Sequence, residues 1–268
     1  MRIFIWIPFI FSIFHGYSQD LDIGSLAVLV ETGYGSGSGF YLADKSKNSI
    51  YFVTAAHVLV DKRNNFYADS VYLISYKKDS QKDQRDSFLI MLELAYKTEL
   101  FTYDLQKDVA VLKIASTKNR GLAYSSHVTK LTSSNTFLNP FYINMAKKIK
   151  EVKTMKDIYT VGYPKSLSLN MNFDYNRPLL RKGVIAGLDL EKGKIVGDMP
   201  VYQGNSGGAV FQSDGAFLIG LVSQFVPFEE RWINNAYGYT NRNIYNSGYA
   251  IIVPVDDIID EVGRLKEE

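Results

Sequence analysis

The serine in the segment QGNSGGAVF, residues 203–211, is the first candidate for chemistry in this chain. Ser206 follows Asn205 and is surrounded by glycines at positions 204, 207 and 208. A serine hydroxyl is a weak nucleophile at neutral pH, so it reacts only when a base takes its proton and a third group orients that base. Without such partners, the same segment is only a glycine-rich turn.

Histidine is the side chain whose ordinary pKa suits the role of base. The chain has three histidines, His15, His57 and His127. His57 closes the segment YFVTAAH, where two small alanines allow close packing around it. His127 lies in the polar segment AYSSHVTK, and we expect it to be solvated. His57 is therefore the predicted base.

The orienting group is predicted to be a carboxylate held in apolar surroundings. Asp108 directly precedes the apolar run VAVLKI, whereas Asp104 lies four residues earlier in the polar segment TYDLQK. Because an unpaired buried carboxylate is costly, Asp108 needs a partner, and an imidazole N–H would serve. The alternative is an aspartate that caps a strand through backbone amides.

The glycines around Ser206 predict a site that stabilises negative charge. In acyl transfer, the carbonyl oxygen gains charge at the tetrahedral stage, and each backbone N–H aimed at it contributes roughly 3 kcal/mol. We expect the N–H groups of Gly204 and Ser206 to point into one cavity, so the predicted oxyanion hole comprises Gly204, Asn205 and Ser206. Gly207 and Gly208 would let this segment pass close to a neighbouring strand.

Short strands must position these residues. Segments rich in β-branched and aromatic residues alternate with turn-forming residues at intervals of about ten, which predicts an all-β fold of two barrels or sandwiches. The last segment is predicted to be a helix over 255–266, because apolar residues recur there at helical spacing. A polar seam divides the chain near 120–155. The expected strands lie within 26–33, 39–44, 49–56, 70–77, 87–96, 109–115, 157–163, 180–190, 194–201, 208–212, 216–225 and 248–254.

Composition excludes several functions for the 268 residues. The net charge of +2 carries no concentrated basic face, which argues against a nucleic-acid partner. The lysines of AKKIKEVKTMKD, residues 146–157, are read as a solvated segment or a weak anionic docking patch. The chain has no cysteine and few histidines, so neither a metal site nor a cofactor is expected.

The first 18 residues read as an export signal. Arg2 precedes an apolar run of 12 residues, Ile3–Phe14, which is too short to span a bilayer. Small residues at positions 16 and 18 place the expected cleavage before Gln19. An uncleaved anchor and a buried first strand are the alternatives. Cleavage would leave a periplasmic or secreted protein without a stable membrane anchor.

Three ordered segments resemble the trypsin-like, chymotrypsin-fold serine proteases, and most closely the bacterial HtrA/DegP-type branch. They are TAAH at 54–57, DVAVLK at 108–113 and GNSGG at 204–208. Softer matches are GSGSGFYL at 35–42, VGYP at 161–164, KGVIAG at 182–187 and Asp198. The resemblance implies two six-stranded β-barrels with a His57–Asp108–Ser206 triad in the cleft between them, followed by a short C-terminal helix. A protease domain over 19–268 would then contain barrels near 21–125 and 155–255.

Departures from the family pattern refine the expectation. Asn205 cannot pair with a newly cut N-terminal amine as an aspartate does there, so activity should not require propeptide cleavage. No PDZ domain is expected. Pro200 stands where a carboxylate selects basic side chains, which predicts a small or medium apolar preference. Ser223, Gln224 and Phe225 are the other predicted substrate-binding residues. Phe225 stands where the digestive enzymes of the family carry glycine, so it is expected to narrow or reshape the subsites beyond the primary pocket.

The resulting hypothesis is an exported endopeptidase that acts on a protein or peptide through an acyl-enzyme. Two alternatives stay open: a protease-fold binding module without turnover, and a hydrolase of esters. The segment 226–248, rich in aromatic residues, is either a lid over the cleft or a packed surface loop. The sequence leaves the oligomeric state open.

Overall fold

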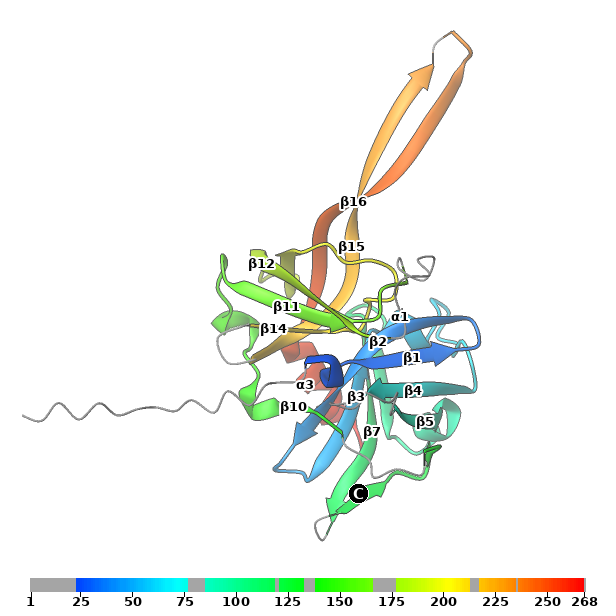
Figure 1. Ribbon diagram of the computed structural model, residues 1–268, viewed down its shortest axis with the longest axis vertical. Coiled ribbons are helices and arrows are strands. Elements are labelled where there is room, and N and C mark those ends of the chain that lie inside the picture. Colours follow the sequence, from blue (N-terminus) through cyan, green and yellow to red (C-terminus); the bar gives the residue numbers. More distant parts are fainter. Residues whose placement is uncertain are drawn as a thin grey trace, which may run out of the picture.

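The fold is known from a computed structural model that describes residues 23–76, 85–118, 121–132, 138–165, 177–212, 217–234 and 236–267. Two β units follow one another along the chain, and the predicted active site lies where they meet (Figure 1). The expected export signal lies outside the described residues. Among those residues, no helix combines the length and the apolar character that crossing a membrane requires.

The first unit is a curled ten-stranded sheet. Its main path runs β6-β7-β3-β2-β1-β4-β5-β9, with β8 paired to β7 and β10 paired to β2. The strands are β1 (Val28–Thr32), β2 (Gly35–Asp44), β3 (Ser49–Thr54), β4 (Ser70–Tyr76), β5 (Arg85–Met91), β6 (Phe101–Asp104), β7 (Val109–Lys118), β8 (Gly121–Tyr124), β9 (Val128–Lys130) and β10 (Phe141–Tyr142).

The centre of this sheet is β2 and β3, which are buried along most of their length. Gly39 in β2 is paired with Thr54 in β3. A Cβ on Gly39 would lie 2.3 Å from the ring of Phe52, so glycine is what lets that ring cover the strand. This packing fixes the end of β3, immediately before His57.

The second unit is a closed barrel of six strands in the order β11-β12-β13-β16-β15-β14. Its core contains branched aliphatic side chains such as Ile158, Ile219 and Ile252. The strands are β11 (Asp157–Gly162), β12 (Leu179–Asp189), β13 (Lys194–Asp198), β14 (Ala209–Gln212), β15 (Phe217–Asn234) and β16 (Tyr239–Pro254).

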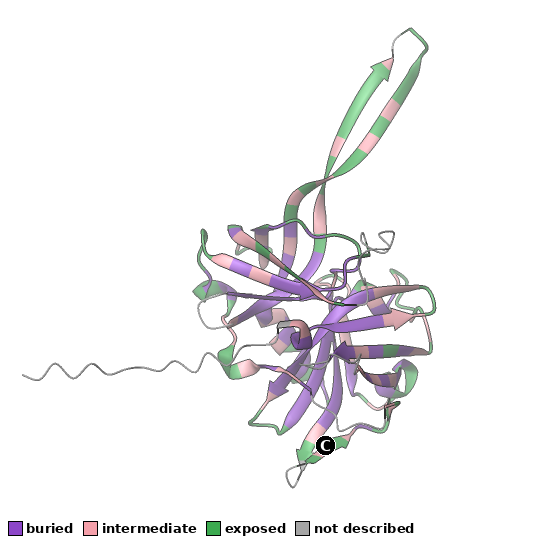
Figure 2. Cartoon of the chain, in the orientation of Figure 1, coloured by how far each residue is buried: buried purple, intermediate pink, exposed green. Residues whose placement is uncertain are grey.

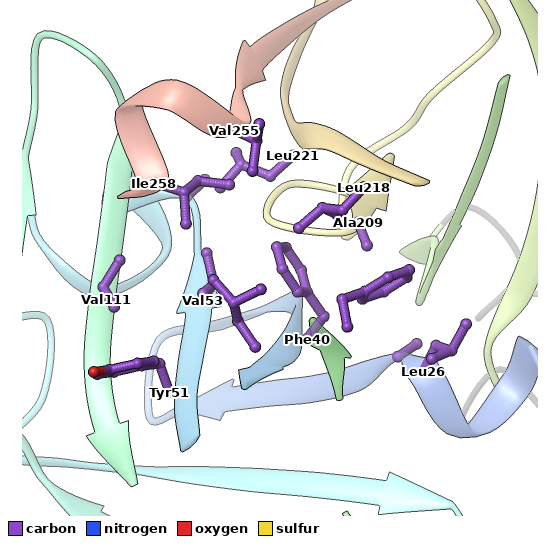
Figure 3. Close-up of a cluster of buried hydrophobic side chains, with 14 of the residues drawn as sticks. Leu26, Phe40, Tyr51, Val53, Val111, Ala209, Leu218, Leu221, Val255 and Ile258 are labelled. Carbon is purple, nitrogen blue, oxygen red and sulfur yellow. The ribbon is translucent and has the colours of Figure 1, made fainter. Parts of the chain in front are cut away.

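In the described ranges, three α-helices and three short 3₁₀ turns accompany the strands. They are α1 (Ala56–Leu59), α2 (Leu92–Lys97), α3 (Val255–Arg264), η1 (Ile23–Leu26), η2 (Ile143–Met145) and η3 (Ile149–Glu151). The apolar face of α3 packs into a core that both units share, where Val255 and Ile258 lie near Leu221 of β15 and Val53 of β3 (Figure 3). The helix therefore packs against both units and connects them.

A long two-stranded ribbon projects from the barrel (Figure 1). Beyond Phe225, β15 and β16 pair only with each other, out to the pair Asn234–Tyr239. The ribbon is largely exposed (Figure 2). Segment 226–248 is thus neither a lid nor a packed surface loop: its described residues within 227–234 and 239–245 form the projecting ribbon, and Asn246 and Gly248 at its base bond to Val201 and Met199 of the body.

The two faces of the ribbon differ in chemistry. Residues that lie directly opposite one another in the ladder share a face, as Phe228 and Tyr245 do. This face carries exposed aromatic side chains. Trp232 and Tyr239 lie on the same face with their rings 5.8 Å apart. The opposite face carries an ion cluster in which Glu229 accepts from two arginines, Arg231 and Arg242.

The predicted fold class is confirmed: the chain is mainly β, with two sheet units and a short C-terminal helix. The second unit is the expected six-stranded barrel, whereas the first is a curled sheet of ten strands among the described residues. Two local expectations were wrong. Residues 92–96, predicted to continue a strand, belong to α2 (Leu92–Lys97), because LELAYK consists mainly of good helix formers. His127, expected in solvent, is fully buried, and its carbonyl accepts from Met91 N–H at 3.0 Å. Three segments of the expected seam, 121–124, 128–130 and 141–142, are strands of the first sheet.

Candidate active site

His57 lies on α1, a single helical turn that starts as soon as β3 ends. The small residues Ala55 and Ala56 are fully buried, so the backbone beside His57 is packed tightly while its ring faces the cleft. The His57 side chain is 48% exposed and can therefore meet a ligand. The sequence pattern of two alanines before a histidine correctly indicated this geometry.

Asp108 precedes β7 in the left-handed backbone region, with φ of 64°. A tight turn holds it there: Asp108 N–H donates to the carbonyl of Asp104 at 2.8 Å. The Asp104 carboxylate accepts from Gln106 N–H at 2.8 Å and from Lys107 N–H at 2.9 Å. Asp104 therefore shapes the turn, and Asp108 is the carboxylate that reaches the cleft.

The Asp108 carboxylate binds His57 through two groups. The ring Nδ1 lies 2.9 Å from Oδ1 and 3.0 Å from Oδ2, and the backbone N–H of His57 donates to Oδ1 at 3.1 Å. The hydroxyl of Ser223 adds a bond of 2.5 Å to Oδ2. Burial would raise the pKa of Asp108, but the hydrogen bonds and charge of His57, with the Ser223 hydroxyl, hold it below its usual value.

Lys107, the residue that precedes Asp108, is held by ion pairs with α3. Lys107 Nζ lies 2.8 Å from Asp257 and 3.2 Å from Asp260 of that helix. Lys194 Nζ of β13 donates to the Lys107 carbonyl at 2.9 Å. The turn that presents Asp108 is thereby tied to both the helix and the second barrel.

Ser206 lies in the turn before β14, at the wall of the cleft. Its hydroxyl donates to the carbonyl of Ser223 at 3.1 Å. Within the part of the chain that the structure describes, no hydrogen bond joins Ser206 Oγ to the His57 ring, although both residues line the same cavity. A rotation about χ1 of Ser206 is the motion that would turn the hydroxyl toward the histidine.

The backbone of the turn directs two amides toward the cleft. Gln203 C=O accepts from Lys165 N–H at 2.7 Å, and Asn205 C=O accepts from Gly208 N–H at 2.9 Å. Because C=O and N–H point in opposite directions across a trans peptide, the N–H groups of the following residues, Gly204 and Ser206, face away from these bonds. Both residues also line a cavity of about 350 Å³ beside His57. The turn thus has the form of an oxyanion hole.

The third residue expected in the oxyanion hole, Asn205, has its amide engaged inside the turn. Asn205 N–H donates to the carbonyl of Tyr202 at 3.0 Å, and its Oδ1 accepts from Tyr202 N–H at 3.0 Å. Asn205 is fully buried. Its side chain therefore closes the turn, while Gly204 and Ser206 supply the outward N–H groups.

Position 204 requires glycine. Gly204 has φ of +95°, and a Cβ there would lie 2.2 Å from the carbonyl oxygen of Tyr163 and 2.9 Å from Lys165 N. A side chain would have to displace backbone atoms on the neighbouring segment. The expectation that a Cβ at this position would hinder the turn agrees with this geometry.

The main cleft has a volume of about 810 Å³. Three of the predicted substrate-binding residues, Ser223, Gln224 and Phe225, line it together with His57 and Ser206. Pro200 is exposed, and the next residues along the chain form the wall in its place. The other lining residues are Val60, Lys62, Tyr67, Leu105, Gln106, Asp108, Lys194, Val201, Tyr202, Gln203, Val222 and Ile251.

Sequence reasoning missed two supporting side chains. Ser223 was predicted to contact substrate, but its hydroxyl also binds Asp108. Ser38, within the glycine-rich segment 35–42, places its hydroxyl 2.6 Å from the carbonyl of Gly204. A small polar residue among glycines of a buried strand is a signal for Ser38, whereas the partner of Ser223 lies 115 residues away and leaves no local signal.

Comparisons with known proteins agree with this arrangement. The family described as trypsin-like peptidase domain matches residues 37–221. The structure is similar to that of an HtrA-type protease, AlgW, determined with a tripeptide, with 17% identity and a TM-score of 0.50 over 89% of this chain and 58% of that one. At this identity the likeness concerns the fold, and this chain spans little more than half of that protein.

Two further solved structures resemble the chain more weakly. The Rv3671c protease in its inactive form has 15% identity and a TM-score of 0.48, over 91% of this chain and 90% of that one. Glu endopeptidase in complex with MPD has 15% identity and a TM-score of 0.49, over 90% and 89%. No curated protein sequence matches the chain significantly.

Proposed function

Because the chain belongs to the family of trypsin-like peptidase domains, as its three motifs predicted, we propose that it is an exported serine endopeptidase using Ser206, His57 and Asp108. The family match spans all three residues. The observation that carries the proposal is their meeting in one cleft, where Asp108 holds Nδ1 of His57 and Ser206 lies beside outward-facing amides. This is the set of groups that acyl transfer needs.

The first chemical step is attack on the substrate. The Ser206 hydroxyl leaves the Ser223 carbonyl and turns to His57 Nε2, which takes its proton as Oγ bonds to the peptide carbonyl carbon. Asp108 keeps the remaining proton on Nδ1 and stabilises the charged ring. The carbonyl oxygen becomes an oxyanion, which accepts hydrogen bonds from Gly204 N–H and Ser206 N–H.

The second stage releases both products. His57 donates its proton to the departing amine as the peptide C–N bond breaks, leaving an acyl group on Ser206 Oγ. Water then attacks the acyl carbon and gives a proton to His57. Collapse of the second tetrahedral intermediate frees the acid, and the proton returns from His57 to Ser206.

The substrate proposed is an extended polypeptide with an apolar side chain before the cleaved bond. The edge of β15 that faces β14 stays hydrogen-bonded to Gly207 and Gly208 as far as Val222, and the strand then continues along the cleft wall through Ser223, Gln224 and Phe225. The neighbouring wall is apolar, with Val201, Val222 and Ile251. Among the described residues that line this cleft, the only acidic side chain is Asp108, which His57 already occupies. A basic side chain would therefore find no partner.

Labelling with a fluorophosphonate tests the nucleophile. We expect the wild-type protein to be labelled and Ser206→Ala to stay unlabelled. Ser49→Ala is the control, because Ser49 lies at the end of β3 away from His57 and should not affect labelling. Equal labelling of wild type and Ser206→Ala would refute the assignment.

A binding module without turnover is the rival that one observation favours, since the Ser206 hydroxyl is bonded to Ser223 and not to His57. Incubation with unfolded casein separates the two. Cleavage that is lost in Ser206→Ala supports the peptidase. Absence of cleavage and labelling, with a specific partner retained by the purified protein, supports the rival. Hydrolysis of ester but not of amide versions of one peptide supports an esterase.

Export is proposed from the sequence alone. Secretion would place the protein in the periplasm or outside the cell, starting at Gln19. N-terminal sequencing of the protein from the extracytoplasmic fraction tests this. A charge in the apolar run, Ile10→Arg, should keep the chain inside with residues 1–18 attached. An intact N-terminus on exported wild-type protein would contradict cleavage.

A further inference from the structure

We infer that Ser38 is a positioning residue whose buried hydroxyl holds the turn that carries the oxyanion donors. This inference rests on the proposed function, because it assigns a role in the same reaction. Ser38 lies in β2 of the first sheet and is fully buried. It bonds directly to the nucleophile turn of the second unit, more than 160 residues later in the chain.

Every polar group of Ser38 has a partner. Its N–H donates to the carbonyl of Ser206 at 2.9 Å, and its carbonyl accepts from Thr54 Oγ1 at 2.7 Å. Its hydroxyl accepts from Tyr163 N–H at 2.8 Å and donates to the carbonyl of Gly204 at 2.6 Å. Ser38 therefore binds the catalytic turn at Gly204 and Ser206, and two neighbouring strand ends at Thr54 and Tyr163.

The bond to Gly204 fixes the peptide that follows the oxyanion donor. The preceding peptide is fixed by Lys165 N–H, which holds the carbonyl of Gln203. With both adjoining peptides held, rotation about the bonds of Gly204 is restricted, and its N–H keeps its direction. Without the Ser38 hydroxyl, the second peptide would be held only by the bond from Asn205 N–H to the Tyr202 carbonyl, and glycine offers little steric resistance to reorientation.

The position requires a group that donates and accepts at once, which a hydroxyl does. Alanine would leave Tyr163 N–H without an acceptor and the Gly204 carbonyl without a donor, both in a buried place. The surroundings are closely packed, since a Cβ on Gly162 would lie 2.6 Å from Ser38 Oγ. The two unsatisfied groups would favour a rearranged turn, in which the oxyanion donor is misdirected.

Steady-state kinetics of Ser38→Ala tests the inference, with a fluorogenic peptide taken from a mapped casein cleavage site. Because loss of one oxyanion donor costs about 10²–10³-fold in kcat, partial misdirection should lower kcat by about 10- to 100-fold. KM should change by less than about threefold, since ground-state binding uses the strand edge. Ser38→Thr keeps the hydroxyl and should stay within about threefold of wild type in kcat.

The matched control is Ser49→Ala. Ser49 is also a buried serine whose hydroxyl binds a backbone carbonyl, that of Lys47, but it lies at the far end of β3. It should lose some stability and keep its kcat. If Ser38→Ala does not fold, Ser38→Thr decides, because a folded threonine variant with a tenfold lower kcat would overturn the inference.

An activity-independent readout separates this inference from the proposed function. In protein labelled with ¹⁵N-glycine, the amide resonance of Gly204 should move in Ser38→Ala and stay in place in Ser49→Ala. A folded Ser38→Ala with kcat within twofold of wild type and an unmoved Gly204 resonance overturns the inference. If the wild type reacts with no fluorophosphonate and cleaves nothing, the proposed function fails, and the Gly204 resonance alone decides whether Ser38 holds the turn.

Discussion

Replacing Asp108 by asparagine is the sharpest perturbation of the proposed mechanism. Asp108 accepts from three donors: the backbone N–H of His57, its ring Nδ1 and the hydroxyl of Ser223. A carboxylate can accept from all three, whereas asparagine has one accepting oxygen and an NH₂ group. The NH₂ group of the asparagine therefore faces a hydrogen-bond donor of His57 or Ser223, with which it cannot form a hydrogen bond.

The magnitude follows from the tautomer of His57. If the NH₂ group of the introduced asparagine faces Nδ1, that nitrogen must accept, and the proton moves to Nε2, where it prevents His57 from taking the proton of Ser206. The corresponding change in a serine protease triad lowers kcat by about 10⁴-fold, or ~5.4 kcal/mol of transition-state stabilisation. The donor of His57 or Ser223 that is left without an acceptor also lowers the free energy of unfolding by ~1–3 kcal/mol.

The assay compares Asp108→Asn with Asp104→Asn. Asp104 lies in the same turn, but its carboxylate accepts only from backbone amides, which an asparagine oxygen can replace. We expect kcat/KM to fall by about 10⁴-fold in Asp108→Asn and by less than about threefold in Asp104→Asn. A folded Asp108→Asn enzyme within tenfold of wild type would refute the reasoning.

Three further predictions follow from the same contacts. Gly204→Ala should lower kcat by about 10²–10³-fold and the free energy of unfolding by ~1–3 kcal/mol, because its Cβ meets the carbonyl of Tyr163; equal kcat in stopped-flow assays would contradict this. The pKa of Asp108 is below its usual value, so its pairing contributes stability above the unfolded pKa of about 3.9 and loses it as the pH falls through the lower folded value. In urea titrations, the difference between wild type and Asp108→Asn should therefore be present above about pH 4 and shrink as the pH falls further below it; a gap that does not shrink at low pH would exclude this origin. Replacing residues 228–245 by Asn-Gly should change the free energy of unfolding by less than ~1 kcal/mol, since the described residues of this range are exposed or half-exposed; a loss above ~3 kcal/mol in urea would show that the ribbon supports the barrel.

The fold class and the three central site residues could be read from local patterns. Alternating β-branched segments predicted the strands, and the helical spacing of Val255, Ile258 and Val262 predicted α3. His57 and Asp108 each stand at the end of an apolar run, where a polar side chain must meet a partner. Residue type and position along a strand are properties of a short segment, so a sequence reveals them.

Other features depended on contacts that local patterns do not contain. The helix α2 competes with the strand before it through small propensity differences. His127 is polar, yet the first sheet covers it. The ribbon could not be foreseen, because a two-stranded ribbon without a core is not expected to stand alone, and aromatic residues usually indicate burial.

The sequence by itself determined that this protein is built of β-strands and carries a serine, a histidine and an aspartate able to act together, because those properties reside in residue types and their immediate neighbours. The tertiary structure alone decided that the Ser206 hydroxyl rests on Ser223, that Ser38 fastens the Gly204 carbonyl, and that Gly204 and Ser206 face outward while Asn205 does not. The physical reason is that hydrogen-bond directions depend on angles and distances between segments far apart along the chain, and only packing sets these.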